Sequence, residues 1–193
     1  MGPALAGVRD LEGAKAVIGV AETALLVPVA AAEPLVHKHR LALDPVAPLG
    51  VPAHVTVLYP FIPPDEVDQS VYDAITDVLA GFPPFDFTLT EVRQFASGVI
   101  YLVPEPPKPF VAITEALTDR WPEHQPYGGT YPDVIPHLSV AMANGDTDAT
   151  ALEADLNGGL PLQSHAEAVW LMEGQPDDRW AIRAVFPLSG GRT

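Results

Sequence analysis

The stretch Ala-His-Val-Thr-Val-Leu-Tyr-Pro at residues 53–60 returns in altered form as Pro-His-Leu-Ser-Val-Ala-Met-Ala at residues 136–143. Successive side chains of a β-strand point to opposite faces, so each copy places a histidine and a hydroxyl on one face. Apolar residues occupy the alternate positions, where a core would hold the strand in place. The sequence therefore predicts two such strands that face each other. Their polar pairs are His54 with Thr56, and His137 with Ser139.

The segments around the two histidine strands follow the same order along the chain. Helical spacing of apolar residues predicts helices at residues 30–39, 65–79, 110–121 and 146–156. Strand patterns predict a strand from residue 23 and hairpins at residues 85–95 with 98–103 and 160–173 with 178–188. Loops rich in Pro or Gly, at residues 41–52 and 124–136, lead into the histidine strands. Because the order helix, histidine strand, helix, hairpin occurs twice, we predict a bilobal α+β protein with pseudo-twofold symmetry.

The length of 193 residues, of which 48% are apolar, suffices for one domain or for two small lobes that share a core. Residues 1–22 are rich in Gly and Ala, so we expect a flexible lead-in there and a single bilobal domain with interleaved lobes at residues 23–193. The first twenty residues lack the apolar run of a secretory signal, and no segment approaches the roughly 20 apolar residues of a membrane span. We expect a cytoplasmic monomer without a membrane partner.

Acidic residues outnumber basic ones by 25 to 10, which gives a formal net charge of −15. Binding to extended nucleic acid depends mainly on Lys and Arg that neutralise phosphates, so this charge argues against such a partner. A short anionic ligand needs only a few local cations and amides. The absence of cysteine excludes disulfides and thiolate chemistry, and it removes the ligands of most structural zinc sites.

Two histidines that converge on one phosphodiester can perform both halves of an acid–base reaction. An imidazole with a pKa near 6.5 accepts a proton as the free base and donates one as imidazolium. One of His54 and His137 would take a proton from water or a ribose hydroxyl, while the other protonates the departing oxygen. Thr56 and Ser139 could then donate hydrogen bonds to the non-bridging phosphate oxygens. This chemistry requires no metal and no other cofactor.

The motifs His-x-Thr-x-Leu at residues 54–58 and His-x-Ser-x-Ala at residues 137–141 resemble the paired signatures of the two-histidine (2H) phosphoesterase superfamily, specifically its 2′-5′ RNA ligase-like branch. The resemblance implies a metal-independent phosphodiesterase with two antiparallel sheets flanking a central cleft and helices on the outside. It also implies activity on 2′,3′-cyclic phosphates or 2′-5′ linkages of small nucleotides or RNA ends, with a ligase reaction in reverse. Ala141 departs from the pattern, because a larger apolar residue often stands there.

Further residues are candidates for substrate binding. Arg40 could bind a phosphate bidentately or pair with Asp44, and both alternatives stay open. Tyr127 and Tyr131 lie in the loop before the second histidine strand, where they could stack on a base. On the last predicted strand, solvation or a salt bridge is the usual role of arginines such as Arg179 and Arg183, although contact with the cleft is an alternative.

Two other readings of the function compete with catalysis by two histidines. His37 and His39 form a His-x-His pair that could chelate a metal, but neither histidine strand contains the carboxylate that would complete a site, so we expect no metal. The same fold could also serve as a nucleotide-binding module with little or no turnover. The retained pair of histidines and hydroxyls argues against this second reading, since binding alone needs no proton donor opposite a proton acceptor.

Overall fold

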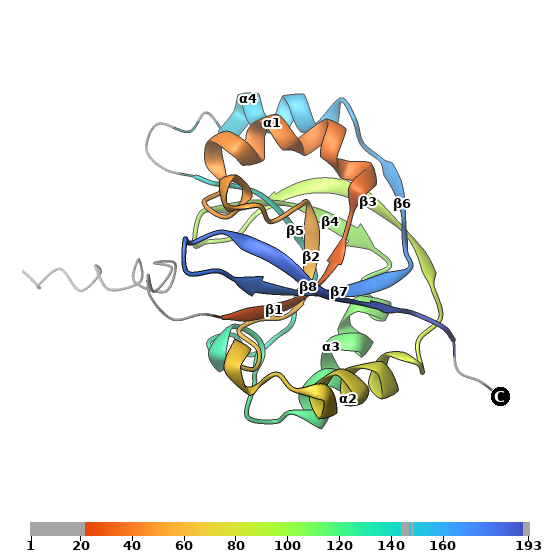
Figure 1. Ribbon diagram of the computed structural model, residues 1–193. Coiled ribbons are helices and arrows are strands. Elements are labelled where there is room, and N and C mark those ends of the chain that lie inside the picture. The colour runs from red at the N-terminus through yellow and green to blue at the C-terminus, as the bar shows by residue number, and fades with distance from the viewer. Residues whose placement is uncertain (1–21, 144–146, 148, 191–193) are drawn as a thin grey trace, which may run out of the picture.

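The computed structural model describes residues 22–143, 147 and 149–190 of the chain (Figure 1). The predicted lead-in at residues 1–22, apart from Glu22, and two positions near the start of the predicted helix at 146–156 lie outside the described residues. The described strands are β1 (Thr23–Pro28), β2 (His54–Leu58), β3 (Phe85–Gln94), β4 (Val99–Glu105), β5 (Leu138–Met142), β6 (Leu162–Ala166), β7 (Ala168–Gly174) and β8 (Trp180–Pro187). The described helices are α1 (Glu33–Leu43), α2 (Gln69–Leu79), α3 (Lys108–Arg120) and α4 (Ala149–Asn157), with short 3₁₀ turns at Ala30–Ala32, Ala47–Leu49, Pro64–Glu66 and Pro126–Gly129. None of the described helices is long and apolar enough to cross a membrane.

The strands form two antiparallel four-stranded sheets. The first sheet has the order β2-β1-β7-β8, and the second has the order β5-β4-β3-β6. Each sheet therefore carries one histidine strand at its edge, β2 in the first sheet and β5 in the second. His54 is the first residue of β2, and His137 directly precedes β5. The predicted α+β class with two antiparallel sheets is confirmed.

The helices connect the sheets by crossing between them. Helix α1 follows β1 in the chain but packs against β5 of the second sheet, together with α4, which contacts α1 and β3. Helix α3 follows β4 but packs against β2 of the first sheet, next to α2, which contacts β8. Figure 1 shows α1 and α4 on one side of the strands and α2 and α3 on the other. Each sheet combines two of the first four strands with two of the last four, and each histidine strand packs against a helix that follows a strand of the other sheet.

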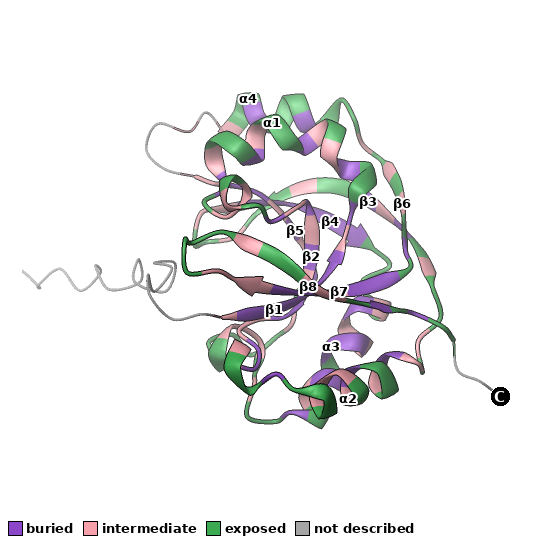
Figure 2. Ribbon diagram, in the orientation of Figure 1, coloured by how far each residue is buried: buried purple, intermediate pink, exposed green. Residues whose placement is uncertain are grey.

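Alternating burial fixes the direction in which each histidine strand points. In β2 the buried residues are Val55, Val57 and Leu58, whereas His54 and Thr56 remain half-buried. In β5 the same alternation buries Leu138 and Val140 and leaves Ser139 half-buried. The buried residues of both strands belong to one hydrophobic cluster, which Figure 2 shows in purple along the strands and the inner sides of the helices. The face of each sheet that bears the histidine and the hydroxyl is called the histidine face below.

One predicted strand is wrong in the structure. The segment 160–173 was expected to be a single arm of a hairpin, but it divides into β6, which pairs with β3, and β7, which pairs with β1 and β8. Glu167 lies between the two strands, and its carbonyl accepts a hydrogen bond of 2.8 Å from the Leu188 N–H. Both halves bury apolar residues, so the pattern of hydrophobicity continues through the point where the chain changes sheet.

The end of α1 also differs from the prediction. The helix continues through Leu43, so the loop into β2 begins later than residue 41. Asp44 ends the helix in an extended conformation, with φ −104° and ψ 118°. Pro45 follows it, and a residue before proline is sterically disfavoured from helical conformation. The local stop signal was therefore Pro45.

We predict that the two faces of β5 differ sharply in their contribution to stability. Leu138→Ala removes a fully buried side chain and should lower the free energy of unfolding by about 2–5 kcal/mol. Ser139→Ala, on the next residue and the opposite face, should change it by about 0.5 kcal/mol or less. Urea denaturation followed by circular dichroism measures both values. Similar losses for the two variants would contradict the assignment of the faces.

Candidate active site

His54 is oriented by the backbone that precedes β2. Its Nδ1 lies 2.7 Å from the Pro52 carbonyl oxygen, and its Nε2 lies 3.1 Å from Thr56 Oγ1. A carbonyl can only accept, so in the neutral ring Nδ1 carries the proton and Nε2 is the acceptor. The Thr56 hydroxyl then donates to Nε2. His54 therefore presents its basic nitrogen on the histidine face of the first sheet.

His137 is oriented in the same way on the second sheet. Its Nδ1 lies 2.7 Å from the carbonyl oxygen of Ile135, which is again two residues before the histidine. Donation to this carbonyl leaves Nε2 as the basic nitrogen of the neutral ring. The repeated sequence thus produces the same tautomer in both halves.

Aromatic rings surround His137. The centroids of Phe95 and Tyr101 lie 5.0 and 5.5 Å from the His137 ring, both in edge-on geometry. Phe95 and Tyr101 also stack on each other at 4.0 Å with an interplanar angle of 20°. Tyr127 lies on the ring at 6.3 Å and 26°. These contacts fix the imidazole and exclude water from much of its surface.

Tyr127 connects the two histidine motifs. Its ring stacks on His137, while its hydroxyl interacts with the side chain of Thr56 in β2. Its backbone N–H donates to the Tyr59 carbonyl at 2.6 Å, and its φ of 53° is a left-handed value that a tyrosine rarely adopts. Tyr127 therefore contacts both histidine motifs, because Thr56 in turn bonds to His54.

Burial lowers the pKa of both histidines. For His54 the pKa falls from 6.5 to about 4: burial is the largest cause, the hydrogen bond to Pro52 opposes it, and Arg40 adds to it. Asp44 raises this pKa and His137 lowers it by smaller amounts, so His54 and His137 are close enough for their charges to interact. For His137, burial lowers the pKa and the bond to Ile135 opposes the change. Both rings are consequently neutral near pH 7.

Arg40 requires a correction as a substrate contact. Its side chain is only 2% exposed, and its Nε donates to Asp44 Oδ2 at 2.9 Å. Its Nη1 donates to the Val51 carbonyl at 3.2 Å. Of the two alternatives for this residue, the ion pair with Asp44 is the one present. Arg40 connects the end of α1 to the loop before β2 through these hydrogen bonds. Its effect on His54 is electrostatic, since its charge lowers the pKa of that histidine.

The remaining predicted residues fall in different places. Ser139 is paired in register with Tyr101, which contacts His137, so its hydroxyl lies on the histidine face. Tyr131 is 59% exposed and packs edge-on against Tyr127 at 5.9 Å. Tyr127 itself is less open to a base than we expected, because its two sides contact His137 and Tyr131.

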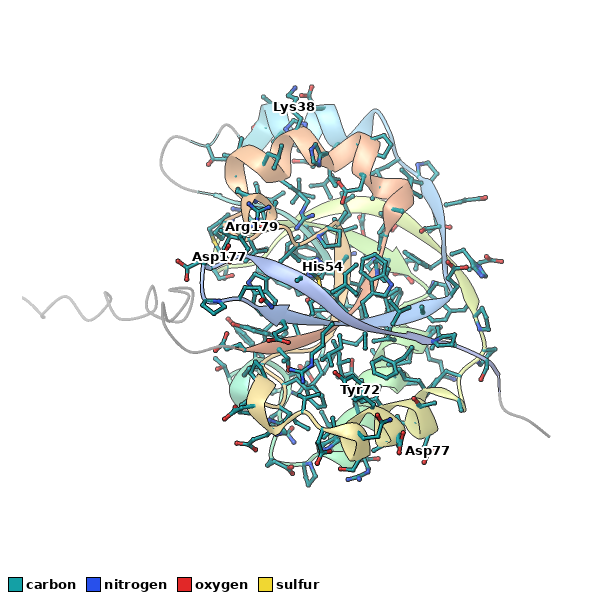
Figure 3. All side chains as sticks on the ribbon, viewed as in Figure 1. Lys38, His54, Tyr72, Asp77, Asp177 and Arg179 are labelled. Atoms are coloured by element: carbon teal, nitrogen blue, oxygen red, sulfur yellow. The ribbon has the colours of Figure 1, made fainter. Side chains whose placement is uncertain are left out.

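The two arginines of the last hairpin do not contact the histidines. Arg183 donates to the Tyr72 hydroxyl, to the carbonyls of Pro64 and Val67, and to Glu173, at 2.7 to 3.0 Å. It therefore has the structural role that we considered the usual one for this face. Arg179 is exposed and lies at the turn between β7 and β8, whereas His54 lies near the middle of the molecule (Figure 3).

No metal site or second reaction centre competes with the two histidines in the described part of the chain. None of the groupings of His, Asp and Glu there has the three members that would hold a metal ion. A surface groove of about 500 Å³ is lined by residues including Asp73, Asp77 and Arg120, and it contains no histidine. Figure 3 labels Asp77 on α2 at the periphery of the molecule, whereas His54 lies near its middle. We assign this groove no role.

We predict that His54 makes the fold sensitive to acid. Between about pH 6.5 and pH 4 the unfolded chain binds a proton that folded His54 does not, so stability falls as the pH falls through this window. His54→Gln removes this term and should lose less stability than the wild type between pH 7 and pH 5. Urea denaturation at the two pH values measures the difference. Equal losses in both proteins would show that the native pKa of His54 is not depressed.

Comparisons with known proteins agree with this geometry. Residues 27–178 match the family described as the 2′-5′ RNA ligase superfamily. No curated protein matches the sequence. Among solved structures, E. coli LigT in complex with NADP⁺ is 16% identical with a TM-score of 0.56, covering 88% of this chain and 98% of LigT. The protein TT0787 of Thermus thermophilus is 19% identical with a TM-score of 0.56, covering 89% of this chain and all of that protein.

At these identities the solved structures establish a shared fold, whereas the family match rests on the sequence itself. That match spans both histidine motifs and most of the described residues. It confirms the resemblance on which the sequence-based expectations depended. The chain belongs to the 2′-5′ RNA ligase superfamily.

Proposed function

We propose that the protein is a metal-independent phosphodiesterase that acts on 2′,3′-cyclic phosphates or 2′-5′ phosphodiester bonds of small nucleotides or RNA ends. The observation that carries this proposal is the set of contacts that joins the motifs: Tyr127 stacks on His137 and interacts with Thr56, which bonds to His54. We propose that the basic Nε2 atoms of the two histidines border one space. A phosphate group between them would meet a proton acceptor on one side and a proton donor on the other.

The proposed reaction begins with proton uptake. Both histidines are neutral near pH 7 before substrate binds, and a bound phosphodiester anion favours the protonated form of a nearby imidazole. The neutral histidine takes a proton from the attacking water as its oxygen bonds to phosphorus. The imidazolium gives its proton to the ribose oxygen as the bond from that oxygen to phosphorus breaks. When the neighbouring ribose hydroxyl attacks in place of water, cleavage of a 2′-5′ linkage gives a cyclic phosphate and a free 5′-hydroxyl. In the reverse of that step the two histidines exchange roles as the 5′-hydroxyl attacks the cyclic phosphate, which is ligation.

Hydroxyl groups on the same faces are placed to hold the phosphate. Thr56 and Ser139 lie one strand step from their histidines, and both are half-buried. We propose that they donate to the non-bridging oxygens as negative charge increases there. Burial raises the pKa of Tyr127 to about 12, so the hydroxyl beside Thr56 keeps its proton near pH 7.

The size of the substrate follows from charge and from the relatives. A chain with a net charge of −15 is unsuited to long nucleic acid, whereas one phosphodiester needs few contacts. E. coli LigT has been crystallised with 3′-AMP and with ATP. By analogy, we propose that this protein also binds a ligand of nucleotide size.

We expect each catalytic histidine to be essential. His54→Ala and His137→Ala should each lower kcat/KM by about 10²–10⁴-fold, because each removes one proton transfer. A panel of 2′,3′-cyclic nucleotides and of 2′-5′ and 3′-5′ linked dinucleotides, assayed beside the double variant, measures this loss and identifies the bond that is cleaved. Circular dichroism checks that the variants fold. Nucleotide binding without any product from the panel would support the alternative of a binding module.

Chelators should leave the activity unchanged. The proposed reaction uses only side chains of the chain itself, so full turnover is expected in excess EDTA. Loss of activity in EDTA that returns on addition of a divalent metal would instead favour a metal-dependent hydrolase.

We predict that Tyr127→Phe lowers kcat/KM by about 3–10-fold, the equivalent of one ordinary hydrogen bond. The ring and its stacking on His137 remain, while the interaction of the hydroxyl with Thr56 is lost. Tyr131→Phe is the matched control, since this exposed tyrosine packs edge-on against the Tyr127 ring and its hydroxyl should not change the rate. Steady-state kinetics on the best substrate of the panel measures both, and equal effects would contradict a specific role for the Tyr127 hydroxyl.

A further inference from the structure

The histidine face of the second sheet extends well beyond His137. Ser139 of β5 pairs with Tyr101 of β4, and Tyr101 pairs with Arg93 of β3. Paired residues of an antiparallel sheet point to the same face, so all three side chains lie on the histidine face. Neighbouring strands are separated by about 4.8 Å, which places the Arg93 backbone about 10 Å from that of Ser139.

An aromatic surface fills the distance between the arginine and the catalytic histidine. Phe95 lies two residues after Arg93 and therefore on the same face. It stacks on Tyr101 at 4.0 Å and contacts the edge of His137 at 5.0 Å. Tyr101 is buried beneath these contacts, whereas Phe95 is half-buried and partly open. A ligand bound at His137 could extend toward β3. Its planar base or its sugar would then lie over Phe95 and reach Arg93.

Arg93 is free to take an anionic ligand. It is the single Lys or Arg in the four strands of the second sheet. Its one ion pair is with Glu91, and both side chains are about half exposed, at 58% and 50%. Exposed pairs of this kind are weak, so a phosphate that accepts two hydrogen bonds from the guanidinium can displace the carboxylate.

Three other arginines of the described chain have partners elsewhere, and the fourth, Arg179, lies exposed at the turn between β7 and β8. Arg40 is buried against Asp44, and Arg183 has four partners on the first sheet and the segment before α2. Arg120 lies over the Trp121 ring at 5.0 Å. In a strongly acidic protein, an arginine on the same face as a catalytic histidine is therefore a specific feature.

We propose that Arg93, with Phe95 and Tyr101, forms a second subsite that binds a phosphate of the substrate other than the reacting one. The substrate class is then a nucleotide with an additional phosphate, such as a 5′-phosphorylated nucleoside cyclic phosphate or an RNA end with its next phosphodiester. This inference rests on the proposed function, because it takes the reacting phosphate to lie between His54 and His137.

The test compares two ligands that differ only in one phosphate. 3′-AMP and adenosine 3′,5′-bisphosphate are titrated into the full chain by isothermal calorimetry, which requires no turnover. Wild type should bind the bisphosphate at least about 10-fold more tightly, and Arg93→Ala should abolish this preference while leaving 3′-AMP binding unchanged. Glu91→Gln, which removes the competing carboxylate, should increase the preference for the bisphosphate.

Lys38→Ala provides the matched control for lost positive charge. Lys38 is 84% exposed on α1 and is paired with the carboxylate of Asp155. It resembles Arg93, which is paired with the carboxylate of Glu91. Lys38→Ala should leave both affinities unchanged. The proposal is overturned if the wild type binds the two ligands equally or binds neither, or if Arg93→Ala weakens both alike. Because these outcomes concern binding, they are distinct from a failure to find phosphodiesterase activity in the substrate panel.

Discussion

Each histidine strand is an edge strand that is buried on only one face, and this constraint determines the site. The core takes every second residue of β2 and β5, so the residues between them must project away from it. A histidine and a hydroxyl two positions apart then share the open face. The carbonyls of Pro52 and Ile135 complete the arrangement by fixing the same tautomer in both rings. The orientation of the histidine and hydroxyl side chains is thus a consequence of core packing on the opposite face of each strand.

The exchange of helices between the two sheets holds the histidine strands in one structure. The histidines are 83 residues apart, and each lies on a different sheet. Since α1 crosses to the second sheet and α3 crosses to the first, neither lobe can bury its apolar surface without the other. The relative position of the two motifs is therefore maintained by the shared core, with Tyr127 as the direct contact between them.

The parts of this site that the sequence predicted are those that depend on local patterns. Alternation is a property of a few consecutive residues, so the pairs His54 with Thr56 and His137 with Ser139 could be placed on strand faces directly. Arg40 could not be resolved, because a partner four residues along a helix and a phosphate in a cleft are equally compatible with the sequence. The sequence pattern also gives no signal that β6 and β7 are separate strands, since both bury apolar residues. The aromatic contacts of His137 and the position of Arg93 depend instead on the register between β3 and β4. The hairpin that joins these strands and the irregularity between Leu89 and Val92 set this register. No local sequence pattern encodes it.

Burial of the two imidazoles has a consequence for how an acidic protein accepts an anion. A site built from permanent cations would attract many anions, whereas neutral histidines attract none until a proton arrives. With their pKa values lowered by burial, His54 and His137 gain positive charge at neutral pH only when a phosphate offsets the cost of charging a buried ring. In the proposed reaction, binding of the anion and acquisition of the catalytic proton are then one coupled event. Under the proposal for Arg93, discrimination among anions falls to groups outside the pair, on the histidine face of the second sheet.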